Sequence, residues 1–140
     1  MIDIRPFEAA DLWKVELQDS QADMSLRFTR EFADAILFSG TAMTAVFHGK
    51  PVAIAGLADI GGQSYAWAFM GKASRPVMLA ATRACMAVLD KRDGDVLVHV
   101  RTDIPANARW LRMMGFATTG MRETMPDGRA YDVWIRTQCK

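Results

Sequence analysis

Hydrophobic and polar residues alternate at the start of the chain and then change to a helical spacing. Ile2 to Arg5 places apolar side chains at every second position, which is typical of a short strand, and Pro6 ends it. Apolar residues then recur every three or four positions from Glu8 to about Ala22, and again from Ser25 to Phe38. This spacing predicts two consecutive helices, each with one apolar face.

The middle of the chain carries turn signals between short apolar runs. Thr41 to Phe47 and Val52 to Ala58 are predicted as strands on either side of the tetrapeptide His-Gly-Lys-Pro at 48–51. Glycine supplies backbone freedom there and proline cannot continue the pairing, so the two strands are expected to form a hairpin. Two glycines at 61–62 make the next turn, and Gln63 to Met70 is predicted as a further strand.

The second half alternates between helix and strand. The predicted elements are a long helix over about Pro76–Lys91, a strand over Val96–Arg101, a short helix over Asn107–Met114 and strands over Phe116–Glu123 and Arg129–Arg136. The two strands that flank the long helix can pair in parallel, because the helix is long enough to serve as a crossover. The sequence therefore predicts an α/β (α+β) fold in one domain over residues 1–140, with a mixed, mostly antiparallel sheet of six to seven strands and about four helices.

Composition narrows the function classes without selecting one. The chain has 140 residues, 51% of them hydrophobic and 24% charged, with a net charge of +1. These values are typical of a soluble domain and give no reason to expect nucleic acid or a membrane span. With only two cysteines and two histidines, a disulfide scaffold or a histidine-rich metal site is not expected. Cys85 lies in an apolar helical pattern, so we expect an inert, buried thiol in a reducing cytoplasm.

Three local sequences resemble the GNAT (Gcn5-related N-acetyltransferase) superfamily. They are the opening residues Ile4-Arg5-Pro6 with Ala10-Asp11-Leu12, the hairpin from His48 to Gly56, and the late helix from Asn107 that ends in Gly115-Phe116. The stretch from Met70 to Arg75 is further similar to GNAT-like internal virion and virion-assembly proteins of short-tailed phages. The narrower resemblance implies a phage or prophage origin.

The superfamily resemblance implies an acetyl-CoA site at the end of the central strand. By this resemblance Phe69 and Met70 would hold the pantetheine arm, and the loop Gly71, Lys72, Ala73, Ser74 and Arg75 would face the pyrophosphate at a helix N-terminus. The loop has a single glycine, and Pro76 lacks an N–H donor. The alternative interpretation is structural, with Ser74 as a helix cap, Pro76 starting the helix, and the basic residues solvated.

The late helix departs from the family pattern. Many members carry a tyrosine that protonates the CoA thiolate four residues before the Gly-Phe pair, and that position here is Leu111. Asn107 could bond the amides of the cofactor, or it could serve as a helix cap or surface residue. Thr102 or Asp103 is a plausible cap for the same helix.

A transferase that acts on amines also needs a general base. The candidates are Asp59 after the second hairpin strand, His99, which faces away from Val98 and Val100, and Glu123. The structural alternatives are a turn residue for Asp59 and an ordinary strand residue for His99. The sequence does not choose between them.

Two functions therefore remain open. The first is an N-acetyltransferase that moves an acetyl group from acetyl-CoA to an unknown amine or protein acceptor in the cytoplasm of a bacterial host. The second is a non-catalytic phage virion or assembly protein that keeps the fold, with a second copy or other virion proteins as partners.

Overall fold

The strands of the chain form one sheet in the order β1-β2-β3-β4-β5-β7-β6. The computed structural model describes residues 2–17, 28–39, 41–72, 74–92, 94–101, 105–124 (without the side chains of 105–107), 126 and 128–137. Its elements are β1 Ile2–Pro6, α1 Asp11–Lys14, α2 Arg30–Ser39, β2 Met43–Phe47, β3 Lys50–Ile60, β4 Gln63–Met70, α3 Arg75–Asp90, β5 Val96–Arg101, α4 Pro105–Met113, β6 Ala117–Thr124 and β7 Ala130–Arg136.

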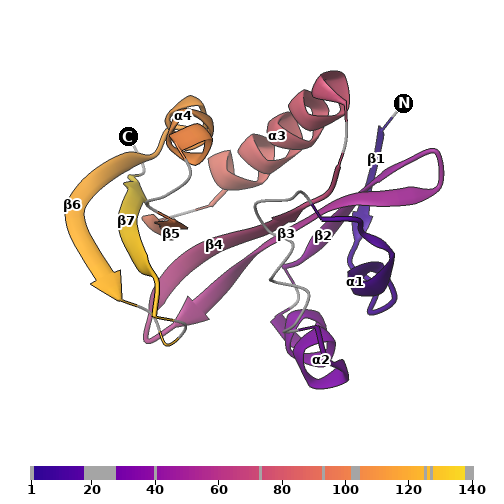
Figure 1. Ribbon diagram of the computed structural model, residues 1–140, viewed down its shortest axis with the longest axis horizontal. Helices are drawn as coiled ribbons and strands as arrows, with labels where there is room; N and C mark the ends of the chain where they lie inside the picture. Colours follow the sequence, from indigo (N-terminus) through magenta and orange to yellow (C-terminus); the bar gives the residue numbers. More distant parts are fainter. Residues whose placement is uncertain are drawn as a thin grey trace.

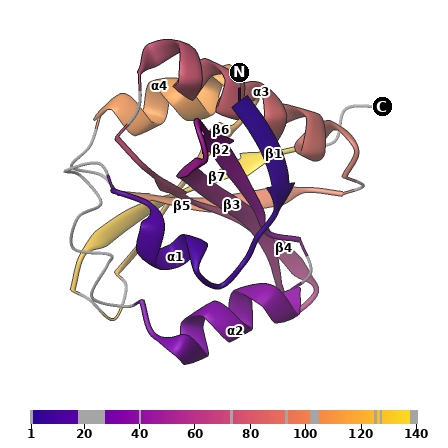
Figure 2. The same ribbon diagram turned by 90° about the vertical axis from the view of Figure 1, so that its right-hand side faces the viewer.

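The pairing confirms the predicted mixed, mostly antiparallel sheet of an α+β domain. β4 and β5 run parallel, as expected for strands joined by the α3 crossover, and every other neighbouring pair is antiparallel. The helices cover both faces, with α1 and α2 on one side and α3 and α4 on the other (Figures 1 and 2). Each face therefore has a hydrophobic core of its own.

The two cores differ in their side chains. Under α1 and α2 the core contains Leu12, Ile36, Ile54 and Phe69, with Phe28, Phe32 and Trp67 packed against it. Under α3 and α4 it is built mainly from aliphatic residues and methionines, with Phe116 and Trp134, in two clusters. The alternation of β5 explains the division, because Val96, Val98 and Val100 pack under α3 and α4 while His99 faces the α2 side.

The first predicted helix is wrong over much of its length. It was expected from Glu8 to Ala22, but α1 ends at Lys14 and Val15 is extended. After Lys14 the chain pairs with the loop that follows β4: the Glu16 carbonyl accepts a hydrogen bond from the Lys72 N–H, and Leu17 forms a bridge with Gly71. Long-range pairing thus overrides the helical spacing, and residues 18–22 lie outside the described part.

The second helix begins later than the predicted Ser25. Residues 25–27 lie outside the described part, and α2 starts at Arg30 after Thr29, whose hydroxyl accepts a hydrogen bond from the Phe32 N–H at 3.1 Å. Thr29 is therefore its N-cap. The proposed caps Thr102 and Asp103 of the late helix also lie outside the described residues. The strands β4 and β5 have the predicted bounds.

Candidate active site

The parallel strands β4 and β5 separate in the middle of the sheet. Their register contains two pairs, Ser64 with Val96 and Tyr65 with Leu97, and the ladder has no further pair in the described part of either strand. β4 continues as far as Met70, paired with β3 alone, while β5 continues along β7. The sheet therefore opens between β4 and β5 immediately after Tyr65.

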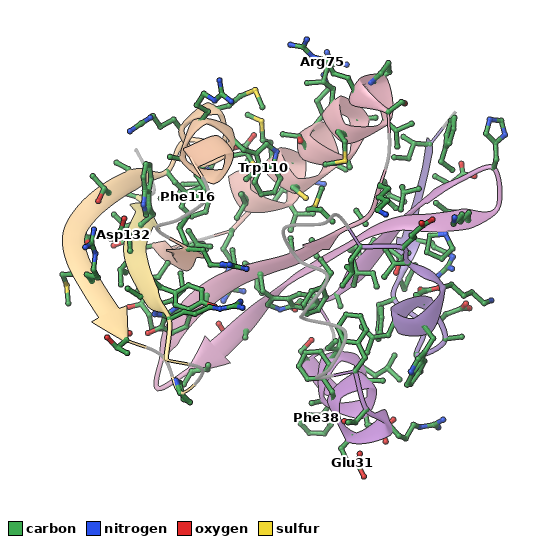
Figure 3. The ribbon with its side chains drawn as sticks, viewed as in Figure 1. Glu31, Phe38, Arg75, Trp110, Phe116 and Asp132 are labelled. Carbon is green, nitrogen blue, oxygen red and sulfur yellow. The ribbon has the colours of Figure 1, made fainter. Side chains whose placement is uncertain are left out.

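On the α3 and α4 side, one tryptophan packs against the cores that contain residues of both separating strands. Trp110 of α4 packs against the cluster that contains Val100 and also against the cluster that contains Met70. Its indole N–H donates to the Thr82 hydroxyl of α3 at 2.7 Å, and Figure 3 shows the ring between the two helices. Met70, predicted to hold the cofactor, is buried beneath α3.

On the α2 side, β4 presents aromatic side chains. Phe69, the other strand residue predicted at the cofactor, is buried, and its ring contacts Phe28 at 5.1 Å and Trp67 at 5.5 Å between centroids. A Cβ at Gly56 would lie 2.6 Å from the Trp67 ring, so glycine leaves the space that the indole occupies. The side chain of Phe69 therefore serves the core of this face.

The loop after β4 uses its first two amides inside the protein. The Gly71 N–H donates to the Val52 carbonyl and the Lys72 N–H to the Glu16 carbonyl, each at 2.7 Å. A Cβ on Gly71 would lie 2.5 Å from the Val52 oxygen, so this glycine permits close contact between backbones. Phosphate binding would then rest on the Lys72 side chain, on Ser74 and Arg75, and on the first turn of α3, whereas Ala73 lies outside the described residues.

The start of α3 retains donors and positive charge. Ser74 occupies the N-cap position, but its hydroxyl makes no capping hydrogen bond, and Pro76 follows in the first turn. The amides of Arg75 and Val77 precede the first intrahelical bond, which runs from the Met78 N–H to the Ser74 carbonyl. Arg75 is exposed and extends away from the sheet (Figure 3). This end of α3 thus has the charge and the dipole that favour an anion.

The basic side chains near this loop share one carboxylate. Glu16 lies 3.3 Å from the ammonium nitrogen of Lys50 and 3.8 Å from that of Lys72, and all three side chains are more than half exposed. Contacts this exposed contribute little to stability.

His99 and Glu123, two separate candidates in the sequence, contact each other. The His99 Nε2 atom lies 3.0 Å from the Glu123 Oε2 atom, although their strands are not neighbours in the sheet. The Tyr65 ring stacks on the imidazole with 5.5 Å between centroids and 12° between planes. This group lies on the α2 side, where β4 and β5 begin to separate, and combines a proton acceptor with a carboxylate.

Asp59 lies on the opposite side of the sheet from His99. Its carboxylate accepts hydrogen bonds from the Ser64 hydroxyl at 2.6 Å and from Arg92 at 2.8 Å, beside an open depression of about 530 Å³. The structure therefore does not bring the two proposed catalytic residues together. Arg92, which sequence reasoning missed, contributes an ion pair to Asp59 that no local pattern indicates.

The late helix contributes an apolar side chain where the family pattern has tyrosine. Leu111 is buried in the core beneath α4 and has no proton to transfer. Asn107 belongs to the backbone of α4, but its side chain lies outside the described part, so its proposed contact with the cofactor stays a prediction. Sequence reasoning also missed Trp110, although its helical spacing from Met114, which is buried, marks the inner side of α4.

Cys85 on α3 is partly buried and not fully buried as expected. This burial raises the pKa of its thiol, which favours the unreactive form. No group of three or more histidine, cysteine, aspartate or glutamate side chains among the described residues could hold a metal ion. No helix within the described ranges is long and apolar enough to cross a membrane.

Solved structures that superpose on this chain include proteins described as GNAT-family acetyltransferases. Ard1 from Thermoplasma volcanium superposes with a TM-score of 0.79 at 17% identity, covering 99% of each chain. A GNAT-family acetyltransferase from Bacillus cereus gives 0.72 at 11% identity, covering 100% of this chain and 99% of the other. YncA from Salmonella typhimurium, solved with its cofactor acetyl-CoA, superposes with a TM-score of 0.68 at 15% identity. That superposition covers 100% of this chain and 95% of YncA.

No model of a known protein family matches the sequence, and no curated protein matches it. At these identities the comparisons establish the GNAT acetyltransferase fold.

Proposed function

We propose that this chain is an N-acetyltransferase that transfers the acetyl group of acetyl-CoA to an amine. The observation that carries the proposal is the separation of β4 from β5 next to His99, whose imidazole contacts Glu123. A fold neighbour is solved with acetyl-CoA, and the uncapped start of α3 with Arg75 offers a place for the pyrophosphate.

His99 is the proposed general base. The amine nitrogen attacks the thioester carbonyl as the imidazole takes its proton, the C–S bond breaks, and the CoA thiolate leaves. Protonation of the thiolate then falls to the imidazolium or to water, because Leu111 offers no proton. Asp59, on the other side of the sheet with Arg92 and Ser64 as partners, is less suited to this role.

Acetyl-CoA binding is the first test. Thermal unfolding with acetyl-CoA, with CoA and without ligand should show stabilisation by about 2.7 kcal/mol when the ligand is at 100 times its Kd. Lys72→Ala combined with Arg75→Ala should weaken the shift. No shift at millimolar acetyl-CoA would contradict the proposal.

Turnover is the second test, measured as release of free CoA thiol with a panel of small amines and peptides. His99→Asn should lower kcat by about 100-fold or more, the contribution expected of a general base. The matched control is His48→Asn, which removes the other histidine from the exposed β2–β3 turn and should leave kcat unchanged. Equal rates for the two variants would exclude His99 as the base.

A second candidate is a non-catalytic protein that keeps this fold, in a phage particle or its bacterial host, with virion proteins as partners. Three observations favour it: Trp110 packs against the clusters that contain Val100 and Met70, the Gly71 and Lys72 amides are already bonded, and Leu111 replaces tyrosine. This candidate predicts that acetyl-CoA does not stabilise the protein against thermal unfolding and that no amine is acetylated. The same two experiments therefore separate the two functions.

A further inference from the structure

The contact between His99 and Glu123 spans a whole strand. β7 lies between β5 and β6, and neighbouring strands are about 4.8 Å apart, so the two backbones are separated by about twice that distance. Val133 of β7 is opposite His99 and is buried, which places both polar side chains above an apolar residue. The contact therefore depends on how β6 presents Glu123.

A bulge in β6 accounts for that presentation. Between the pairs Thr118 with Trp134 and Arg122 with Asp132, β6 advances four residues while β7 advances two. The hydroxyl of Thr119, inside the bulge, donates to the Val133 carbonyl at 2.8 Å and holds the distortion against β7. The two extra residues shift the register of β6, so that Glu123 pairs with Tyr131 and shares a face of the sheet with Val133 and His99.

The carboxylate selects one tautomer of the histidine. An ionised Glu123 can only accept hydrogen bonds, so at 3.0 Å the Nε2 atom of neutral His99 must carry the hydrogen. The lone pair is then on Nδ1, which becomes the atom that accepts a proton. Stacking on Tyr65 restrains the plane of the same ring.

We propose that Glu123 is a positioning residue for His99: it fixes the tautomer and orientation of the imidazole and stabilises the imidazolium that forms when Nδ1 takes a proton. This inference rests on the proposed acetyltransferase function and adds a role for Glu123 that differs from that of a base. It follows the logic by which a carboxylate orients a catalytic histidine in other enzymes.

Two substitutions separate the parts of this role. Glu123→Ala removes both the hydrogen bond and the charge and should lower kcat by about 10- to 100-fold, with the KM for acetyl-CoA unchanged. Glu123→Gln keeps an acceptor oxygen and should retain an intermediate kcat. Because Glu123 is about half exposed, neither change should move the thermal midpoint of unfolding.

The matched control lies on the other face of the same hairpin. Asp132 pairs with Arg122 at 3.0 Å, and Asp132→Asn should leave kcat and KM unchanged. If Glu123→Ala turns over as fast as the wild type, the inference fails while the acetyltransferase function stands.

A spectroscopic measurement tests the inference without turnover. In ¹⁵N-histidine-labelled protein at a pH where His99 is neutral, the nitrogen shifts should report the Nε2–H tautomer, and Glu123→Ala should shift the population toward a mixture. A mixture already present in the wild type would overturn the inference. If the tautomer is as expected and no amine is acetylated, the proposed function fails, and with it any role for Glu123 in the reaction.

Discussion

The carboxylates of Asp11 and Glu123 each accept a hydrogen bond from a basic side chain, but their surroundings are very different. Asp11 is 1% exposed and accepts from both terminal nitrogens of Arg5, at 2.7 and 2.8 Å. It also accepts from the Glu8 N–H at 2.9 Å and the Thr44 hydroxyl at 2.7 Å. Glu123 is 48% exposed and its partner His99 is 24% exposed.

The difference indicates which cluster serves the fold and which is available for chemistry. Burial by itself raises the pKa of the Asp11 carboxyl, but its hydrogen bonds and the charge of Arg5 outweigh burial and leave that pKa below its ordinary value. A carboxylate held in this way joins β1, α1 and β2 and has little capacity left for a ligand. The His99–Glu123 contact uses the Nε2 atom, so under the proposed function Nδ1 would take the proton of the acceptor amine.

The largest expected effect is from Asp11→Ala. Removing one member of a buried ion pair typically costs about 3–5 kcal/mol, and we expect about 2–4 kcal/mol because Arg5 can reach water. The Thr44 hydroxyl and the Glu8 N–H also lose their acceptor. Urea unfolding measures the change, and kcat per folded molecule should stay the same. A loss of stability below about 0.5 kcal/mol, the range of an ordinary surface substitution, would show that the cluster does not hold the fold together.

The second prediction concerns pH. A carboxyl whose pKa is lowered by folding adds stability above its unfolded pKa of about 3.9 and loses it as the pH falls through the folded pKa. The difference in unfolding free energy between the wild type and Asp11→Asn should therefore be larger at pH 6 than at pH 3. A difference independent of pH would mean that the Asp11 carboxyl has the same pKa in the folded and unfolded chain.

Local sequence patterns predicted the structure correctly where a single strand or a single turn determines it. The alternation around His99 predicted its face, and the tetrapeptide at 48–51 predicted the hairpin between β2 and β3. The end of α1 could not be predicted, because it depends on the hydrogen bond from Lys72 to Glu16, across more than fifty positions of sequence. The non-local hydrogen bond, rather than the spacing of apolar residues, decides where that helix stops.

The His99–Glu123 contact is outside the reach of sequence patterns for a similar reason. Both residues could be proposed as bases separately, but their meeting requires β7 to lie between β5 and β6 and a bulge that shifts Glu123 into register with Tyr131. Neither the strand order nor the two extra residues of the bulge follow from alternation along a single strand.

The smallest expected effect concerns the stability contribution of the His99–Glu123 contact. Exposed ion pairs contribute about 0–1 kcal/mol, and surface substitutions usually change stability by about 0.5 kcal/mol or less. A double-mutant cycle of His99→Asn and Glu123→Ala in urea should therefore give a coupling energy below about 0.5 kcal/mol. The same cycle with Arg5→Ala and Asp11→Ala should give a clearly larger value, since both residues belong to one hydrogen-bonded network. If the two coupling energies were equal, the His99–Glu123 pair would be a structural element like the Asp11 cluster. A loss of activity in Glu123→Ala would then reflect damage to the fold instead of a lost orientation of His99.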